Sequence, residues 1–403
     1  MKDKLLTVAK NHAPCYLYEY EVMAQQVKTL QGTFPNFDLL YSIKANPYPP
    51  VVKALASFGI GADAASAGEV ALARECGMWA EDIFFSAAGK SDAALQRAWD
   101  ACEIIADSLG EVSRIGALAA QRGEHRAIGI RMNPAFAFGG GEGGSSKFGI
   151  DEEDLPRLKE LLKTIPVTVE GLHVHLRSQT LEADALGRCY QDSWALAKRL
   201  SEELGEPLRY VNFGSGVGVA YDEEQESPMD LEKLRTYTDA IVAENETTLR
   251  ARLMIETGRF LTCKMGTYWL PVVDKKISRG VTYVITEGCM NGLQKPALAV
   301  MLHHADPAGT LAAYEPLYTS AWAFPVVAHG DTTTTERVNI VGNLCCAADV
   351  LVENFEGPRL EVGDLVEVKN AGAYACTLTA QRFSGHTPPA ELLLDGEGNI
   401  MES

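Results

Sequence analysis

The sequence lacks any long apolar run. No stretch approaches the roughly 18 consecutive apolar residues that a membrane-spanning helix needs. The segment Met1–Leu6 leads into Lys10 and His12 without the apolar core of a secretory signal. We therefore expect neither a membrane span nor an export signal.

Basic residues are fewer than acidic residues. The chain has 36 Lys+Arg against 54 Asp+Glu, a formal net charge of -18. A surface of that sign repels the phosphates of nucleic acids and the headgroups of anionic lipids. We therefore expect no nucleic-acid and no membrane partner, and an acidic carrier protein would need a local basic patch.

The cysteines lack a recognisable spacing. There are nine, no CxxC or Cys/His cluster resembles a zinc site, and only Cys345 and Cys346 lie close together in sequence. An odd number without a framework favours free thiols in a reducing compartment, so we predict a cytoplasmic protein. The 46% hydrophobic and 22% charged residues are typical of a globular chain.

A regular alternation of short apolar segments and amphipathic stretches begins after the first 40 residues or so of the chain. The predicted strands are Leu39–Ile43, Gly59–Ala64, Ile83–Ser86, Glu103–Asp107, Ala127–Met132, Val169–Leu176, Tyr210–Phe213 and Leu253–Glu256. Eight strand–helix units over roughly 220 residues predict an α/β fold, a closed (β/α)8 TIM barrel. An open doubly wound sheet is the alternative, but no GxGxxG motif opens a helix after the first strand.

The character of the chain changes after Arg259. Five β-rich segments separated by turn residues predict a C-terminal all-β domain, a sandwich or barrel: Thr267–Val273, Val281–Thr286, Val338–Val341, Leu365–Lys369 and Glu391–Leu394. An early strand near Tyr16 is expected to join it. We therefore predict an N-terminal segment at 1–20, a barrel at 21–261 and a β domain at 262–403.

Lys44 ends the first barrel strand, in Tyr41-Ser42-Ile43-Lys44-Ala45-Asn46. In a barrel of this kind the carboxyl ends of the strands form the active site. Burial would push an ammonium at such a position towards its neutral, nucleophilic form, which is what a Schiff-base lysine needs. A solvated surface lysine is the alternative interpretation.

Other polar residues cluster at the same predicted strand ends. The turn Gly214-Ser215-Gly216-Val217-Gly218 follows a buried strand and predicts a nest of backbone N–H groups that opens a helix and binds phosphate. Beside a lysine, such a nest suggests pyridoxal phosphate. His173 and His175 share one face of a strand, so a metallohydrolase using both as ligands is the alternative from a different class.

Three further side chains have both a chemical and a packing interpretation. Glu256 ends the eighth strand and can pair with a pyridine nitrogen or with a neighbour such as Arg259. Cys345 is either a reactive thiol or a small buried apolar residue. Tyr374 follows a glycine turn and can bind phosphate or pack. The Gly-rich stretch 138–146 is either a flexible connection or an active-site loop.

These motifs resemble, in order and over nearly the whole chain, those of the fold-type III pyridoxal-phosphate decarboxylases, which act on diaminopimelate, ornithine and arginine. The motifs include Gly61-Ala62-Asp63, Ser146-Lys147-Phe148-Gly149-Ile150, His173-Val174-His175, Glu256-Thr257-Gly258-Arg259 and Ala371-Gly372-Ala373-Tyr374. The resemblance implies a barrel of the alanine-racemase type plus a β domain. It also implies pyridoxal 5'-phosphate as cofactor, a homodimer and active sites shared between subunits.

The resemblance also implies a role for individual residues. Lys44 would hold the cofactor covalently, His175 would stack on its ring and Glu256 would pair with its ring nitrogen. Cys345 would enter from the partner subunit and return a proton to the substrate. The remaining cofactor-binding residues are Asp63, Ser178, Gly214, Ser215, Gly216, Gly258, Arg259 and Tyr374. A non-catalytic cofactor-binding protein of the same barrel type usually lacks the β domain expected here.

The substrate pocket departs from the family pattern at three positions. Cys346 stands where the diaminopimelate enzymes carry glutamate, Arg177 replaces a glycine, and Lys295 replaces an arginine. The distal pocket thus lacks the usual partner for an amine and suits an anion. This pattern is similar to the decarboxylases of siderophore and butirosin biosynthesis, which act on conjugated amino acids. Diaminopimelate decarboxylation to L-lysine, or decarboxylation of a basic amino acid, is the alternative.

Overall fold

The computed structural model describes residues 2–306 and 323–401. The chain divides into two compact units, which are considered separately below. One comprises Val27–Val219 and Pro228–Gly258, and the other Met1–Gln26, Ala220–Ser227 and Arg259–Ser403. The first is called the barrel unit and the second the β unit. The domain boundaries expected from the sequence remain predictions.

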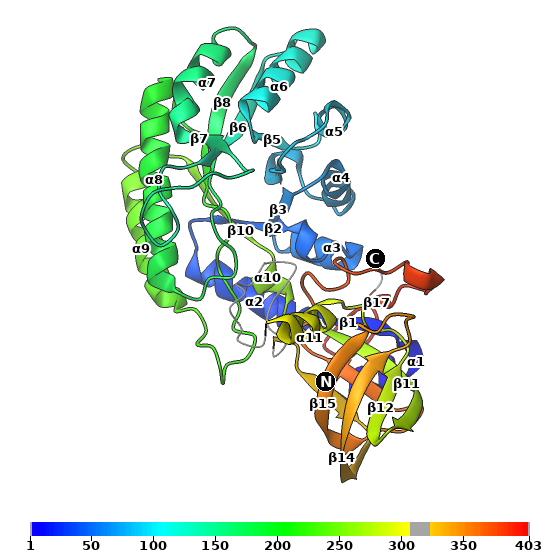
Figure 1. The fold of residues 1–403 in the computed structure, drawn as a ribbon. Helices are drawn as coiled ribbons and strands as arrows, with labels where there is room; N and C mark the ends of the chain where they lie inside the picture. Colours follow the sequence, from blue (N-terminus) through cyan, green and yellow to red (C-terminus); the bar gives the residue numbers. More distant parts are fainter. Residues whose placement is uncertain (1, 307–322, 402–403) are drawn as a thin grey trace. The chain divides into compact units, whose positions relative to one another are not determined.

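The barrel unit contains a closed ring of parallel strands (Figure 1). Within the described residues eight strands form the ring, in the order β5-β4-β3-β2-β10-β9-β8-β6, and a β5–β6 pairing closes it. The strands are β2 (Asp38–Ser42), β3 (Gly61–Ala64), β4 (Ile83–Phe85), β5 (Glu103–Ala106), β6 (Arg126–Asn133), β8 (Val167–His173), β9 (Tyr210–Asn212) and β10 (Arg252–Thr257). The short β7 (Ile150–Asp151) pairs with β6 outside the ring. The (β/α)8 barrel predicted from the sequence is confirmed.

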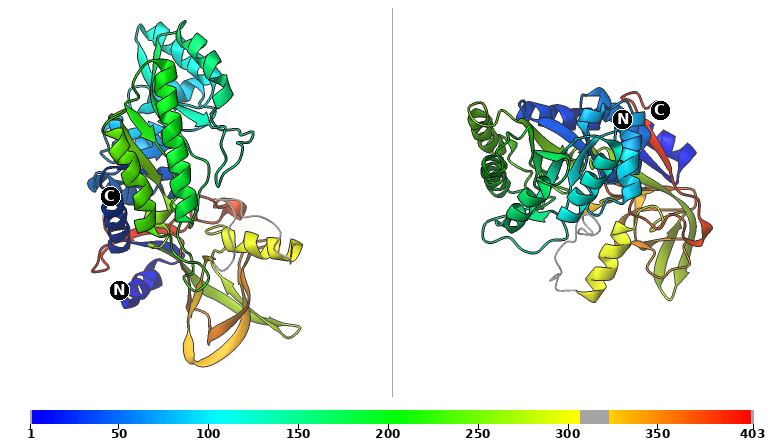
Figure 2. Two further views of the ribbon diagram at one scale, coloured as in Figure 1. Left: turned by 90° about the vertical axis from the view of Figure 1, so that its left-hand side faces the viewer. Right: turned by 90° about the horizontal axis from the view of Figure 1, so that it is seen from above.

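Helices follow the strands and lie outside the ring (Figure 1). They are α3 (Pro49–Ser57), α4 (Ala67–Glu75), α5 (Asp92–Ala98), α6 (Leu109–Arg122), α7 (Leu155–Leu162), α8 (Ala183–Leu204) and α9 (Leu231–Asn245). Helix α2 (Tyr20–Thr33) begins in the β unit and ends in the barrel unit. Figure 2 shows α8 and α9 side by side, where Tyr237 donates to Asp184 at 2.9 Å and Trp194 to Glu244 at 2.8 Å.

Side-chain caps mark where several of these helices begin. The hydroxyls of Ser66, Ser91 and Ser108 accept the main-chain N–H three residues on, at the first turns of α4, α5 and α6. At α4 the contact is reciprocal, since Glu69 accepts the N–H of Ala65 at 2.6 Å. Such caps satisfy N–H groups that the helix itself leaves unbonded, and they fix the strand-to-helix turns at the barrel mouth.

The interior of the barrel is filled by a layer of large apolar side chains. Leu40, Phe84, Ile105, Tyr210 and Met254 form this buried cluster, each from a different strand. The Tyr210 ring fits because two neighbouring strands carry glycine: a Cβ at Gly171 would lie 2.0 Å from the ring and one at Gly129 2.2 Å from its hydroxyl. The barrel is thus packed solid beneath its mouth, as is typical of this fold.

The β unit is built on β11 (Gly266–Ser278), a strand long enough to join two groups of strands. Its first half pairs with β1 (Cys15–Glu19) and β16 (Leu365–Val368), and its second half pairs with β12 (Val281–Thr286). The sheet continues through β14 (Asp331–Gly342) to β15 (Val350–Arg359), and β13 (Val326–His329) flanks β16. β1 also pairs in parallel with β17 (Ala390–Leu394).

The predicted all-β C-terminal domain is confirmed as a mostly-β unit, but it contains more than the sequence predicted. β13 and β15 were not expected, and α11 (Lys295–Ala305) forms where no helix was predicted. Helix α1 (Lys2–His12) and the short α10 (Arg259–Thr262) also belong here. No helix in the described part of the chain has the length and apolar character that crossing a bilayer requires.

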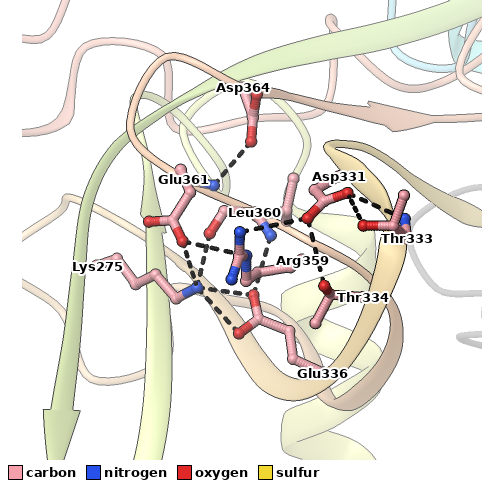
Figure 3. A network of polar contacts seen from close by, with 9 residues as sticks. All are labelled: Lys275, Asp331, Thr333, Thr334, Glu336, Arg359, Leu360, Glu361 and Asp364. Atoms are coloured by element: carbon pink, nitrogen blue, oxygen red, sulfur yellow. Dashed lines mark hydrogen bonds and ion pairs between the residues drawn. The ribbon is translucent and has the colours of Figure 1, made fainter.

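A polar network ties β11 to β14 and to the segment after β15 (Figure 3). The amine of Lys275 lies 2.9 Å from both carboxylate oxygens of Glu336 and donates to the carbonyl of Leu360 at 2.7 Å. Glu336 in turn accepts the N–H of Leu360 at 2.9 Å. Both charged side chains are largely buried, so the network fixes how these strands lie against one another.

Candidate active site

Lys44 lies at the mouth of the barrel, in the short 3-10 helix η1 (Ile43–Ala45) that follows β2. Its amine donates to Oδ2 of Asp63 at 2.6 Å. Asp63 is fully buried on β3 and also accepts the hydroxyls of Ser42 and Ser86. These three donors from neighbouring strands hold the carboxylate in place, and it in turn orients the lysine.

The expectation that burial makes Lys44 poorly hydrated is wrong for this chain. Its side chain is 44% exposed, and its amine faces a carboxylate. The strand-end position is correct, but the environment differs because Ile43 and Ala45 take the buried positions of η1 and leave Lys44 pointing out of the packed layer. Position and pairing, rather than desolvation, distinguish this lysine.

Glu256 is a buried carboxylate near the end of β10. Asn212 on β9 donates to its Oε1 at 2.9 Å, and Nε2 of His173 lies 3.2 Å from the same oxygen. That second contact has the distance of an ion pair, although among the described residues neither ring nitrogen of His173 has a well-aligned hydrogen-bond partner. Burial opposes ionisation, but His173 and the charge of Lys44 hold the pKa of Glu256 well below its usual range.

His175 lies just beyond β8 and is held in one tautomer. Its Nδ1 accepts the main-chain N–H of Ser215 at 3.1 Å, so the proton of the neutral ring is on Nε2, which lies 3.2 Å from the Ser178 hydroxyl. Desolvation lowers the pKa of His175 to about 4, and the attraction of Glu256 only partly opposes this shift. His175 therefore presents a neutral imidazole at neutral pH.

The Gly214–Gly218 turn follows β9. Gly214 has a left-handed φ of 67°, and its N–H donates to Oδ1 of Asn212 at 2.9 Å. Gly218 donates to the Thr180 carbonyl at 2.9 Å. The main-chain N–H groups of Gly216 and Val217, in contrast, have no acceptor among the described residues. The predicted anion-binding nest thus narrows to these two amides.

This turn does not open a helix, contrary to the sequence-based expectation. The chain continues without regular structure to α9, which begins at Leu231. Leu186 packs closely on Gly216, and a Cβ at Gly216 would lie 2.4 Å from the Leu186 methyl group, so the leucine would have to move. The turn is shaped by packing on α8 and by the Thr180–Val217 bridge rather than by a helix N-terminus.

Four residues of the barrel mouth were missed by the sequence analysis: Ser42, Ser86, Asn212 and Arg131. Arg131 on β6 is buried, its Nη2 donates to the His175 carbonyl at 3.2 Å, and Asp107 lies 4.0 Å from its Nη1. Burial lowers the pKa of Arg131, while the nearby carboxylates oppose that shift. All four are polar residues near a strand end, which the sequence does show. Their partners lie on other strands, so the contacts that give them a role cannot be predicted from the sequence.

The β unit brings together three further predicted residues. The Arg259 guanidinium lies 4.8 Å from the ring centre of Tyr374, and its Nη1 donates to the Tyr221 hydroxyl. The amine of Lys295 is buried 5.7 Å from the same Tyr374 ring. Tyr374 has a left-handed φ of 51°, which a tyrosine rarely adopts without a structural reason.

Cys345 and Cys346 lie in the turn between β14 and β15 and are both exposed. The buried Asp349 shapes this turn, since its carboxylate accepts the N–H of Leu344 at 2.9 Å and that of Met290 at 2.8 Å. The interpretation of Cys345 as a small buried apolar residue is therefore wrong. Both thiols are presented on the surface of this chain.

The residues of the barrel mouth fit pyridoxal phosphate. Unsatisfied N–H groups at a glycine turn suit a phosphate. A buried carboxylate that stays ionised suits a protonated pyridine nitrogen, and a lysine at a strand end suits an aldehyde. Lys44, His175, Glu256 and the Gly214–Gly218 turn all occur together in one unit.

Comparison with known proteins agrees with this chemistry. Residues 21–263 match the family model described as "Pyridoxal-dependent decarboxylase, pyridoxal binding domain". The chain belongs to the pyridoxal-dependent decarboxylase family. It is therefore a carboxy-lyase that acts on an amino acid, with pyridoxal phosphate as cofactor.

Relatives of this decarboxylase have different substrates in their names. The L-glutamyl-[BtrI acyl-carrier protein] decarboxylase of Niallia circulans is 31% identical over 94% of this chain and 88% of that protein. The 2-[(L-alanin-3-ylcarbamoyl)methyl]-2-hydroxybutanedioate decarboxylase of Staphylococcus aureus is 27% identical over 96% and 95%. The diaminopimelate decarboxylase structure of M. jannaschii with L-lysine shares the fold, with a TM-score of 0.83 at 22% identity over 98% and 90%.

The metallohydrolase alternative is not supported. β8 ends at His173, so His173 and His175 do not lie together on one strand as expected. The Nδ1 lone pair of His175 is used by Ser215, and His173 faces Glu256. The family match instead places both histidines in a decarboxylase.

Proposed function

We propose that this enzyme removes the α-carboxylate of an amino acid that is conjugated through its side chain to a larger acyl group. The observation that carries the proposal is the substitution at position 346. Cys346 lies exposed beside Cys345, where the diaminopimelate enzymes that the sequence resembles place a glutamate for the distal amine. A thiol offers no charge to an ammonium group, so a free diamino acid loses its main distal partner.

The names of two relatives support a conjugated substrate. One acts on a glutamyl group attached to an acyl-carrier protein, and the other on an amino acid amide-linked to a hydroxytricarboxylic acid. Both match this chain over more than nine-tenths of its length. Decarboxylation of free diaminopimelate to L-lysine is the second candidate, because diaminopimelate decarboxylases also match over nearly the whole chain.

The roles proposed for the residues are those that the family resemblance implies. When bound, the pyridine ring of the cofactor accepts the electron pair that the departing carboxylate leaves behind. Lys44 would hold the cofactor aldehyde, with Asp63 orienting its amine. His175 would pack on the ring as a neutral imidazole, and Glu256 would keep the ring nitrogen protonated. Ser178, Gly216, Gly258, Arg259 and Tyr374 are assigned to the cofactor phosphate, together with the N–H of Val217. The N–H groups of Gly214 and Ser215 are already bonded to Asn212 and His175, so these two residues would shape the turn that holds the phosphate.

We further propose that the active enzyme is a cytoplasmic homodimer in which Cys345 completes the site of the partner subunit. The exposure of Cys345 supports this assignment, because a thiol presented on an ordered turn is available to another chain. In that position Cys345 would return a proton to the substrate Cα after carbon dioxide leaves. Lys295, buried beside Tyr374, is proposed as a substrate-binding residue.

Carbon dioxide release from a panel of substrates tests the proposed function. The panel pairs free diaminopimelate, ornithine, arginine and glutamate with amino acids amide-linked to citrate or thioester-linked to a carrier. We expect the conjugates to give a kcat/KM at least about tenfold higher than the free amino acids. Efficient turnover of free diaminopimelate alone would refute the conjugate proposal and favour the second candidate.

A change at Cys346 provides a matched test. Cys346→Glu restores the distal carboxylate of the diaminopimelate pattern, so we expect it to raise kcat/KM for free diaminopimelate relative to the conjugates. Cys346→Gln has nearly the same size without the charge and should not cause this change. An identical preference in both variants would show that position 346 does not select the substrate.

A further inference from the structure

Two phenylalanines of the loop between β6 and β7, Phe138 and Phe148, each lie against a cation. The Phe138 ring centre lies 5.3 Å from Cζ of Arg177, which follows β8. The Phe148 ring centre lies 4.5 Å from Cζ of Arg131 and 4.7 Å from the amine of Lys147. These are distances at which a cation is attracted to an aromatic ring. The Gly-rich stretch 138–146 is thus anchored to the barrel mouth at both ends.

Arg177 differs from Arg131 in what surrounds its polar edge. Arg131 is buried and donates to the His175 carbonyl. Arg177 is exposed, and no described residue accepts a hydrogen bond from it or forms an ion pair with it. The contact of Arg177 Cζ with the Phe138 ring uses none of the guanidinium N–H donors. The edge of Arg177 is therefore free to bind a planar anion such as a carboxylate.

The position of Arg177 relates this edge to the active site. Its backbone is two residues beyond His175, whose ring is held by Ser215 of the glycine turn. Arg177 therefore leaves the chain at the rim of the cofactor site rather than within it. This rim is where the distal part of a substrate would extend from a barrel-mouth site.

We propose that Arg177 binds a carboxylate on the distal acyl group of the substrate, and that Phe138 is the positioning residue that holds Arg177 for this purpose. The inference rests on the proposed function and narrows it to conjugates of a di- or tricarboxylic acid. A free diamino acid would bring an ammonium group towards Arg177 and be repelled. A carrier-bound aminoacyl thioester offers no carboxylate at this point.

Phe138 is suited to such a role because it lies in the Gly-rich loop rather than in the packed barrel. A long exposed arginine samples many rotamers, and an anion that binds it must first restrict them. The aromatic face removes part of that freedom in advance without occupying any donor. Replacement of Phe138 should therefore weaken anion binding while leaving every hydrogen-bonding group in place.

Calorimetric titration of citrate into the holoenzyme tests the site without turnover. We expect wild type to bind citrate, and Arg177→Gln to weaken binding by about 10- to 100-fold, the range for loss of a charged hydrogen-bonding partner. Phe138→Leu should weaken it by about 2- to 5-fold, and Phe138→Trp should restore it, since tryptophan keeps the ring face. The control Arg209→Gln removes an exposed arginine that pairs with Glu170 before β9, and its citrate affinity should equal that of wild type.

Equal citrate affinity in wild type and Arg177→Gln, or no citrate binding by wild type, would overturn the role of Arg177. Equal weakening by Phe138→Leu and Phe138→Trp would overturn the positioning role of Phe138. Turnover supplies a second readout: Arg177→Gln should raise KM for the citrate-linked amino acid and leave KM for its methyl esters unchanged. Release of carbon dioxide only from free diamino acids would instead defeat the proposed function, and is distinguishable because it does not depend on position 177.

Discussion

The amine of Lys44 lies 2.6 Å from a carboxylate oxygen of Asp63, yet Asp63 is fully buried while 44% of the Lys44 side chain is exposed. The carboxylate is thus part of the barrel and the lysine projects from it. A buried carboxylate with three donors from neighbouring strands is costly to displace, so Asp63 fixes the direction in which the Lys44 amine points.

Replacement of Lys44 by alanine should abolish the visible absorbance of bound cofactor and lower turnover by several orders of magnitude, because the covalent anchor is lost. Spectra of the purified protein and carbon dioxide release measure the two effects. Lys53→Ala, on the surface of α3, is the matched control and should retain both. Full activity in Lys44→Ala would rule out the assignment of this lysine.

Replacement of Asp63 by asparagine should destabilise the protein by roughly 2–4 kcal/mol, because a buried charge that orders three donors is removed. Denaturant unfolding measures the change. Asp92→Asn removes an exposed partner of Arg114 and should alter stability by less than about 1 kcal/mol. Similar losses in the two variants would show that the buried site contributes no more than a surface pair.

Replacement of Asn212 by aspartate should weaken cofactor binding, because it places a second carboxylate 2.9 Å from Glu256 and removes the N–H donor. The repulsion raises the pKa of Glu256, so the protonated form competes with the ionised form that suits the ring nitrogen. Spectrophotometric titration with pyridoxal phosphate between pH 5 and pH 8 tests this. An affinity and pH dependence like those of wild type would contradict the role given to Glu256.

Acid should destabilise the protein partly through His175. Its pKa is about 4 in the folded chain, below the value of about 6.5 expected when unfolded, so the unfolded state binds a proton first. Stability is therefore retained above about pH 6.5 and falls as the pH drops towards 4. Thermal unfolding of wild type and His175→Gln over this range measures the difference. A parallel decline in both proteins would show that His175 contributes nothing.

Replacement of two glycines of the barrel unit by alanine should change the stability of the protein in opposite directions. Gly171→Ala forces a methyl group into the Tyr210 ring and should destabilise the fold by about 1–3 kcal/mol. Gly32→Ala, in helix α2 with open space around it, should stabilise by up to about 1 kcal/mol. Denaturant unfolding measures both variants. Destabilisation by Gly32→Ala as large as that by Gly171→Ala would contradict the packing argument.

Most barrel strands were predictable because their residues are buried on both faces and form short runs rich in apolar side chains, as in β2, β4 and β5. β15 was not, because Asn354 with a left-handed φ, Gly357 and Pro358 interrupt its pattern. β13 is only Val326–His329, too short to stand out from its surroundings. The helix α11 was not predicted because Pro296–Leu302 is a continuous apolar run without amphipathic periodicity, and no side chain caps its start.

The site was predictable where an ionisable residue stands at the end of a predicted strand, as Lys44 and Glu256 do. It was not predictable where the role depends on a neighbour from another strand. Ser86 matters because it faces Asp63, and Asn212 because its amide joins Glu256 to the Gly214 N–H. The exposure of Lys44 depends on the turn into η1, which no local apolar pattern specifies.

The pairing of β1 with β17 affects how the protein can be made. β1 lies between β11 and β17. It therefore cannot complete its hydrogen bonding until β17, which is translated much later, has been made. On the ribosome, the barrel strands β2 to β10 emerge in one uninterrupted stretch and can assemble while translation continues. Until both partners have been made, β1 exposes unpaired strand edges, which are templates for pairing with other chains.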